Sequence, residues 1–268
     1  MRVWSFLSAL ALASMPYVAT AHEFWIDPVA YQVPSGGDLV ATLRVGENFA
    51  GSEQSYLERN FERFDMRCAG EESPVPGRSG DRPALNVAAP QDGLCVIIHQ
   101  TRDYTLTYRD WQKFVNFVEH KDFDGVLAAH SERGLPETGF VELYSRYAKS
   151  LIAVGDATGS DSEVGLETEI VAEANPYTDD MSGGFPIRVL YNGAPRGDAQ
   201  VEMFARMPDG EVEVTLHRTD ADGRVTLPVQ PGTAYLADAV VLRPIEPQAE
   251  DGPVWESLWA SLTFAVPE

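Results

Sequence analysis

The chain has 268 residues, of which 44% are hydrophobic, and its formal net charge at pH 7 is −21. This length suits one large domain or two ordinary domains with real hydrophobic cores. Such an acidic chain repels nucleic-acid phosphates and anionic lipids, so both are excluded as expected partners.

Residues 1–21 have the pattern of a secretory signal peptide. Arg2 supplies the positive charge, residues 6–15 form a short apolar stretch, and Ala19-Thr20-Ala21 provides a small-x-small cleavage site. No other stretch approaches the ~20 apolar residues that a membrane-spanning helix needs. We therefore expect a periplasmic protein with no integral membrane segment in its mature chain.

Cleavage after Ala21 would leave His22 at the new N-terminus. A histidine in that position offers two metal donors, the α-amine and the imidazole Nδ1, and both can bind one ion. The simpler alternative is a solvated chain end with no ligand role. Cleavage one residue away would remove the amine from this argument.

Residues 22–155 are expected to form a first β-sandwich of short strands and turns. Residues 39–45 alternate apolar with other side chains, as a half-buried strand does, and residues 94–99 form a compact apolar strand. Cys68 and Cys95 are the two cysteines of the chain, and in an oxidising compartment they are expected to form one disulfide. The alternative is two buried thiols.

The spacing of apolar residues then changes from that of a strand to that of a helix, and a helical insertion is expected at about residues 110–148. Asp110 and Asp122 can each cap a helix, because apolar residues follow both at helical spacing. A third short helix is expected over residues 140–147, followed by a return to strand at 148–154.

Residues 155–163 resemble a linker, and residues 164–268 are expected to form a second sandwich. Turn signals such as Asn192-Gly193 and Asp222-Gly223 separate its apolar segments. The seven expected strands are residues 167–172, 185–191, 199–206, 211–219, 224–229, 233–242 and 255–266. The predicted fold class is therefore mainly β, with two immunoglobulin-like β-sandwich domains and a short helical insertion at the end of the first.

Several segments together resemble one bacterial family. They are HEFW (22–25), SRYAKSL (145–151), NPY (175–177), TDADGR (219–224) and WESLWASLTF (255–264). The family is the periplasmic domain-of-unknown-function family often labelled a nickel-uptake substrate-specific component. That resemblance implies an exported, β-rich protein linked with nickel or cobalt uptake. The C-terminal half also resembles the regulatory β-sandwich modules found beside carboxypeptidases and outer-membrane receptors.

Imidazole suits nickel, cobalt, copper and zinc, so the histidines are the candidate metal ligands. With His22 we select His99, which ends the strand of Cys95 on the same side, and His130, which lies on the apolar face of its predicted helix. For both, a structural role is the alternative. His120 and His217 are interpreted as structural or exposed. No motif for hydrolysis, phosphate binding or dinucleotide binding is present, so no catalytic residue is assigned.

The leading hypothesis is a non-catalytic periplasmic protein that binds a divalent transition metal for uptake or homeostasis. Its expected partner is an envelope metal transporter or an outer-membrane receptor. One alternative is a β-sandwich module that docks onto an envelope protein or a polymer without metal. Another is a copper-dependent oxidative enzyme, which would need Phe24 and Trp25 exposed as a flat aromatic face around His22.

Overall fold

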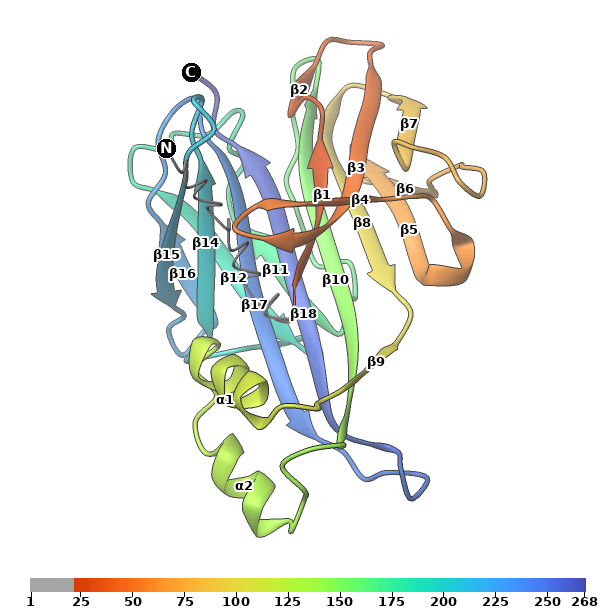
Figure 1. Ribbon diagram of the computed structural model, residues 1–268. Coiled ribbons are helices and arrows are strands. Elements are labelled where there is room, and N and C mark those ends of the chain that lie inside the picture. Colours follow the sequence, from red (N-terminus) through yellow and green to blue (C-terminus); the bar gives the residue numbers. More distant parts are fainter. Residues whose placement is uncertain (1–21) are drawn as a thin grey trace, which may run out of the picture.

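The computed structural model describes residues 22–268, and the predicted signal peptide lies outside that range. The protein is mainly β, as predicted, and its strands form three sheets (Figure 1). The first sheet pairs three strands with β3, and its members are β1 (Glu23–Pro28), β3 (Asp38–Glu47), β4 (Ala50–Gln54) and β7 (Leu85–Ala88).

The second sheet has ten strands and runs through the whole molecule. Its main path, in spatial order, is β15 (Val212–Arg218), β14 (Gln200–Arg206), β17 (Ala234–Pro244), β18 (Pro253–Ala265), β10 (Val141–Val154), β8 (Gly93–Thr101), β5 (Phe61–Cys68) and β6 (Glu71–Pro74). Two short strands, β2 (Gln32–Val33) and β9 (Tyr104–Thr107), also pair with β10. A short 3-10 helix, η1 (Glu58–Asn60), precedes β5.

The third sheet consists of β11 (Thr168–Ala172), β12 (Phe185–Tyr191), β13 (Ala194–Pro195) and β16 (Arg224–Leu227). It packs on one face of the ten-stranded sheet, and the first sheet packs on the other. Alternation along β8 shows the arrangement, because Val96 and Ile98 belong to the core under the third sheet while Cys95 and Ile97 belong to the core under the first. A strand buried on both faces is apolar along its length, as residues 93–98 of β8 are.

The two sandwiches therefore share one continuous sheet. A parallel pairing of β10 with β18 joins the two halves of the shared sheet, and in this pairing Ser145 lies opposite Leu258. The predicted ranges 22–155 and 164–268 each supply one covering sheet and several strands of the common layer. The boundary between two domains stays a prediction.

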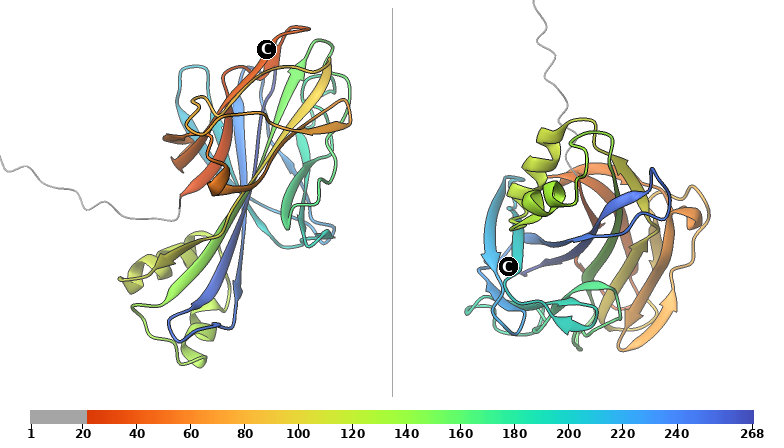
Figure 2. Two further views of the ribbon diagram at one scale, coloured as in Figure 1. Left: turned by 90° about the vertical axis from the view of Figure 1, so that its right-hand side faces the viewer. Right: turned by 90° about the horizontal axis from the view of Figure 1, so that it is seen from below.

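Two helices form the expected insertion, α1 (Trp111–His120) and α2 (Val126–Glu132). Asp110 caps α1 as predicted, by accepting a hydrogen bond from the backbone N–H of Gln112 at 3.0 Å. Both helices pack against the ends of β10, β17 and β18 that project beyond the sandwiches (Figures 1 and 2). The aromatic side chains of Trp255 and Trp259 fill that contact. No helix in residues 22–268 is long and apolar enough to cross a membrane.

The expected third helix over residues 140–147 is wrong, because this segment begins the long strand β10. Leu143 and Tyr144 match a helical spacing, but hydrogen bonding to β9 and β18 on either side holds the backbone extended. The strands predicted between residues 167 and 266 are present at nearly the expected positions. The predicted disulfide is also present, between Cys68 on β5 and Cys95 on β8.

Candidate functional site

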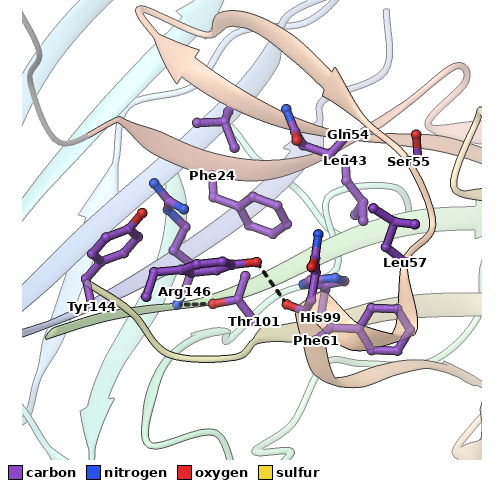
Figure 3. Close-up of a pocket in the computed structure, with 13 residues that line it drawn as sticks. Phe24, Leu43, Gln54, Ser55, Leu57, Phe61, His99, Thr101, Tyr144 and Arg146 are labelled. Carbon is purple, nitrogen blue, oxygen red and sulfur yellow. Dashed lines mark hydrogen bonds between the residues drawn. The ribbon is translucent and has the colours of Figure 1, made fainter. Parts of the chain in front are cut away.

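A pocket of about 260 Å³ lies beside the first strand of the described chain, between the first sheet and one face of the ten-stranded sheet (Figure 3). Strands β1, β3, β8, β9 and β10 and the chain around η1 contribute to its wall. The lining residues are Phe24, Leu43, Val45, Gln54, Ser55, Leu57, Asn60, Phe61, His99, Thr101, Tyr104, Tyr144 and Arg146. Most of this wall is apolar or aromatic.

The polar end of the pocket is built on β9 and β10. The rings of Tyr104 and Tyr144 stack with their centroids 5.5 Å apart, and the Arg146 guanidinium lies 4.8 Å from the Tyr144 ring centroid. Thr101 accepts a hydrogen bond from the backbone N–H of Arg146 at 2.9 Å, and the Tyr104 hydroxyl donates to the carbonyl of Asn60 at 3.2 Å. These contacts fix the cation and the two rings in one layer.

Arg146 has an unusual environment for a cation in an acidic protein. Its Nη2 donates to the His22 carbonyl at 3.2 Å, but its Nε is buried and has no hydrogen-bond partner. Within residues 22–268 no carboxylate forms an ion pair with this guanidinium within 4.0 Å. Removal from water lowers the pKa of Arg146, and the opposing effects of Tyr144, Tyr104 and Glu23 do not make up for it.

His99 forms the inner wall of the same pocket and is only 3% exposed. Its ring contacts those of Phe24, Phe61 and Phe64 at centroid distances of 4.9, 5.4 and 5.1 Å. This burial lowers the pKa of His99 to about 3, so the imidazole is neutral at physiological pH. Its Nδ1 is buried without a hydrogen-bond partner.

His22 lies just before β1, and its carbonyl contacts Arg146 of the pocket wall. Its Nδ1 is 3.2 Å from a carboxylate oxygen of Glu47 at the end of β3, and both side chains are nearly half exposed. Phe24 and Trp25, which follow it, are buried at 5% and 0% exposure. The exposed aromatic face required by the oxidative-enzyme hypothesis is therefore not formed by these two residues.

His130 lies elsewhere, in the core between the two helices and the projecting strand ends. Both of its ring nitrogens are engaged: Nδ1 accepts from the Trp255 indole at 3.0 Å, and Nε2 lies 3.1 Å from the Pro136 carbonyl. The structure thus places His99 in the pocket wall, His22 outside the lining but in backbone contact with Arg146, and His130 in a separate core, where it makes structural contacts. The metal role predicted for these residues stays a prediction.

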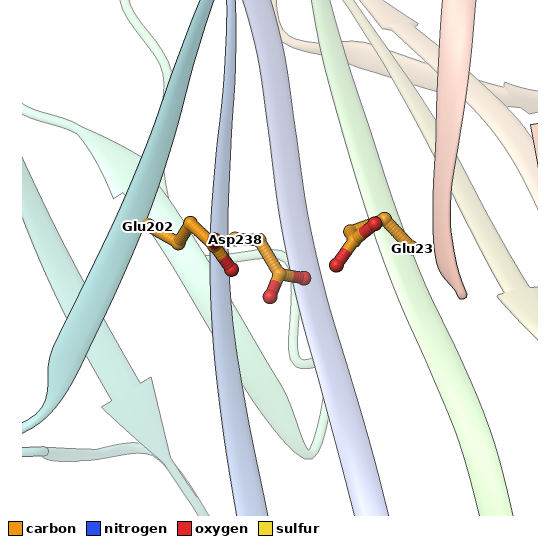
Figure 4. Close-up of side chains that lie close together, drawn as sticks. All are labelled: Glu23, Glu202 and Asp238. Carbon is orange, nitrogen blue, oxygen red and sulfur yellow. The ribbon is translucent and has the colours of Figure 1, made fainter. Parts of the chain in front are cut away.

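The residues 22–268 contain one group of three side chains spaced closely enough to share an ion, namely Glu23, Glu202 and Asp238 (Figure 4). Their carboxylates already share the ammonium of Lys121, with Nζ–O distances of 3.3, 2.6 and 2.9 Å. Burial alone would lower the pKa of Lys121, but the three carboxylates hold it above its usual value. We call these four residues the Lys121 cluster; the ammonium occupies the place that a metal would need.

The Lys121 cluster joins elements that are distant in sequence. Lys121 follows α1, Glu23 is on β1, Glu202 on β14 and Asp238 on β17. Glu202 has a further partner in His120, at 3.2 Å. Burial opposes ionisation of Glu202, but hydrogen bonds from His120 and Lys121 lower its pKa to about 2.

Besides the pocket and the Lys121 cluster, a buried carboxylate lies where the helices meet the strand ends. Glu142 on β10 accepts hydrogen bonds from the Tyr108 hydroxyl at 2.7 Å and from the Ser257 hydroxyl, and Trp259 donates to Ser257 at 2.9 Å. No cation pairs with this carboxylate among the described residues. Burial therefore raises the pKa of Glu142 to about 7.

Comparisons with known proteins give little beyond the family. No curated protein matches the chain. A tetra-tandem repeat from the extending region of a large adhesion protein is 12% identical, with a TM-score of 0.20 over 92% of this chain and 50% of that structure. The D0-D1 domain of intimin is also 12% identical, with a TM-score of 0.20 over 91% of this chain and 97% of that structure. The chain spans half the length of the adhesion-protein structure.

The family comparison covers much more of the molecule. The profile of the domain of unknown function DUF4198 matches residues 19–243, which include both covering sheets, the helical insertion and every strand of the shared sheet except β18. The chain therefore belongs to the DUF4198 family.

Proposed function

We propose that this protein is a non-catalytic periplasmic accessory protein that binds a divalent transition metal for uptake or homeostasis. In this proposal the processed N-terminus supplies the α-amine and Nδ1 of His22, and Glu47 supplies a carboxylate oxygen. The partner that receives or delivers the metal would be an envelope transporter or an outer-membrane receptor.

The observation that carries the proposal is the 3.2 Å distance between His22 Nδ1 and Glu47 Oε1. Two donor atoms that are each about 2.0–2.2 Å from one ion lie roughly 3 Å apart, so this pair needs little rearrangement to bind a metal. A donor set of two nitrogens and one carboxylate oxygen suits nickel, copper, cobalt and zinc. Both side chains are nearly half exposed, whereas the Nδ1 atom itself is buried, so the imidazole must turn slightly to admit the ion.

The ligand set supported in this way differs from the three histidines selected from the sequence. His99 lines the pocket, but aromatic rings surround it. His130 has its two ring nitrogens in hydrogen bonds within a separate core. Glu47 replaces both in the proposed site because it lies next to His22.

The test uses protein exported and processed in a periplasm, with its N-terminus verified by mass spectrometry. Calorimetric titration with nickel, cobalt, copper and zinc should show a Kd below about 1 μM for at least one metal. One added alanine before His22 should weaken that Kd by about 100-fold, and Glu47→Gln by about 10-fold. His217→Asn is the matched control and should change nothing, since His217 lies on the far edge strand β15. Equal affinities with and without the added alanine would refute the proposal.

The docking-module hypothesis is a second candidate, and one observation favours it. Strand β15 is an edge of the ten-stranded sheet, and its side chains Val214 and Leu216 are 39% and 59% exposed. An exposed apolar pair on a sheet edge can receive a strand of a partner. Correctly processed protein that binds none of the four metals, and that loses capture of a purified envelope partner on Leu216→Lys, would support this hypothesis instead.

A further inference from the structure

The pocket contains a cation that the protein itself does not neutralise. The chain carries 41 acidic residues against 20 lysines and arginines. Several cations inside it have acidic partners; Lys121 and Lys149, for example, contact three and two carboxylates. Arg146 and Arg196 each keep a buried guanidinium nitrogen without a partner, but of these two only Arg146 lines this pocket. A guanidinium without a carboxylate partner in a pocket wall can pair with an acid that comes from outside.

We propose that the pocket binds a small organic carboxylate with an apolar body, its carboxylate on Arg146 and its body against the aromatic wall. The proposal goes beyond the metal function above and does not depend on it. The planar guanidinium is the side chain best suited to pair with a carboxylate, because two parallel N–H···O bonds match its geometry.

The opposite wall defines the rest of the ligand. Phe24, Leu43 and Leu57 face the interior of the pocket across from Arg146 (Figure 3). Such a wall favours an aliphatic or aromatic body over a sugar or a second charge. His99, buried at the inner end, offers an unpartnered ring nitrogen for one further hydrogen bond. The volume of about 260 Å³ is just below the range of drug-sized sites, which limits the ligand to one ring or a short chain.

A metal ion is a poor occupant for the same pocket, because the Arg146 charge repels it. A phosphate ester is also less suitable, since Arg146 is the single lysine or arginine in the lining. One guanidinium balances one carboxylate, and the remaining lining combines apolar and aromatic side chains with uncharged polar ones.

The test measures binding of phenylacetate and of its neutral counterpart phenylacetamide to the full processed protein, by calorimetry with a metal chelator present. The chelator separates this result from the metal proposal, because a ligand bound through a metal would be lost. Phenylacetate should bind at least about ten-fold more tightly than phenylacetamide, since only the carboxylate gains charge-assisted hydrogen bonds from Arg146.

Three variants locate the site. Arg146→Gln should remove the ten-fold preference for the carboxylate, whereas Arg102→Gln should keep it, since Arg102 is exposed, paired with Glu62 and outside the pocket lining. Leu57→Trp should weaken both probes by filling the apolar wall while Arg146 stays in place. It also keeps the test valid if Arg146→Gln does not fold.

Three results would each overturn the proposal. They are equal affinity of wild-type protein for the acid and the amide, an unchanged preference in Arg146→Gln, and no saturable binding of phenylacetate, benzoate or hexanoate up to about 10 mM. Full retention of phenylacetate affinity in Leu57→Trp would place any binding outside the pocket and would also refute it.

Discussion

Removal of the Lys121 ammonium should destabilise the protein more than most single substitutions. The variant Lys121→Met keeps much of the side-chain volume but leaves Glu23 and Asp238 with no cation within 4.0 Å in the described chain. The three carboxylate side chains are at most 7% exposed, so water cannot solvate them in place of the ammonium. Breaking such a buried pair from one side costs about 3–5 kcal/mol.

We therefore expect Lys121→Met to lower the free energy of unfolding by about 4 kcal/mol at pH 7. The assay is equilibrium unfolding in urea, followed by tryptophan fluorescence, with equal slopes required of both proteins. Lys113→Met is the matched control, because Lys113 lies on α1, which Lys121 follows, is half-buried and has no ion-pair partner among residues 22–268. That control should change stability by less than about 0.5 kcal/mol.

A compensating variant tests the cause of the loss. Adding Glu23→Gln, Glu202→Gln and Asp238→Asn to Lys121→Met should restore most of the stability, because replacing all members of a buried ionic group is often close to neutral. A loss below about 1 kcal/mol for Lys121→Met alone would refute the argument, since the cluster would then be hydrated or unimportant.

Two further predictions concern stability. The pKa of Glu142 is raised from 4.5 to about 7 in the folded protein, so its contribution is complete below pH 4.5 and is lost as pH rises through 7. This loss is about 3 kcal/mol of unfolding free energy. The Glu142→Gln variant should flatten the dependence of the unfolding free energy on pH between pH 4.5 and 7. An unchanged slope would contradict the raised pKa of Glu142. The Cys68–Cys95 disulfide closes a separation of 27 residues, so Cys68→Ser with Cys95→Ser should lower the unfolding free energy by about 3 kcal/mol. Wild-type protein with its disulfide reduced should show the same loss. A double variant as stable as the oxidised wild-type protein would exclude a stabilising role of the disulfide.

Local signals in the sequence predicted the strands and the disulfide well. The C-terminal strands are bounded by turn residues such as Asn192-Gly193 and Asp222-Gly223, whose conformations depend on neighbouring residues alone. The start of β10 was predicted as a helix because Phe140, Leu143 and Tyr147 also fit a period of 3.6. Pairing with strands far away in sequence decided its conformation, and a short apolar pattern carries no record of such pairing.

The candidate pocket was only partly predictable. His22 and His99 are predicted from residue type; His99 lines the pocket, and the His22 carbonyl contacts Arg146 of its wall. The sequence assigns no role to Arg146, although two cations, Arg146 and Lys149, within one largely apolar strand are an available signal. Glu47 and Lys121 had no such signal, because one acidic residue among 41 and one lysine after a helix are ordinary features until the fold surrounds them.

The parallel pairing of β10 with β18 has a consequence for the order of assembly. β18 is synthesised after every other strand, yet it lies between β17 and β10 in the middle of the shared sheet. Until it inserts, the strand edges of β10 and β17 stay open, and the cores under the third sheet and beneath the helices lack the side chains that β18 supplies. Contacts between such distant segments fold slowly. The emerging chain thus passes through a stage in which open edges invite aggregation, and a chaperone that protects β10 and β17 would act at that stage.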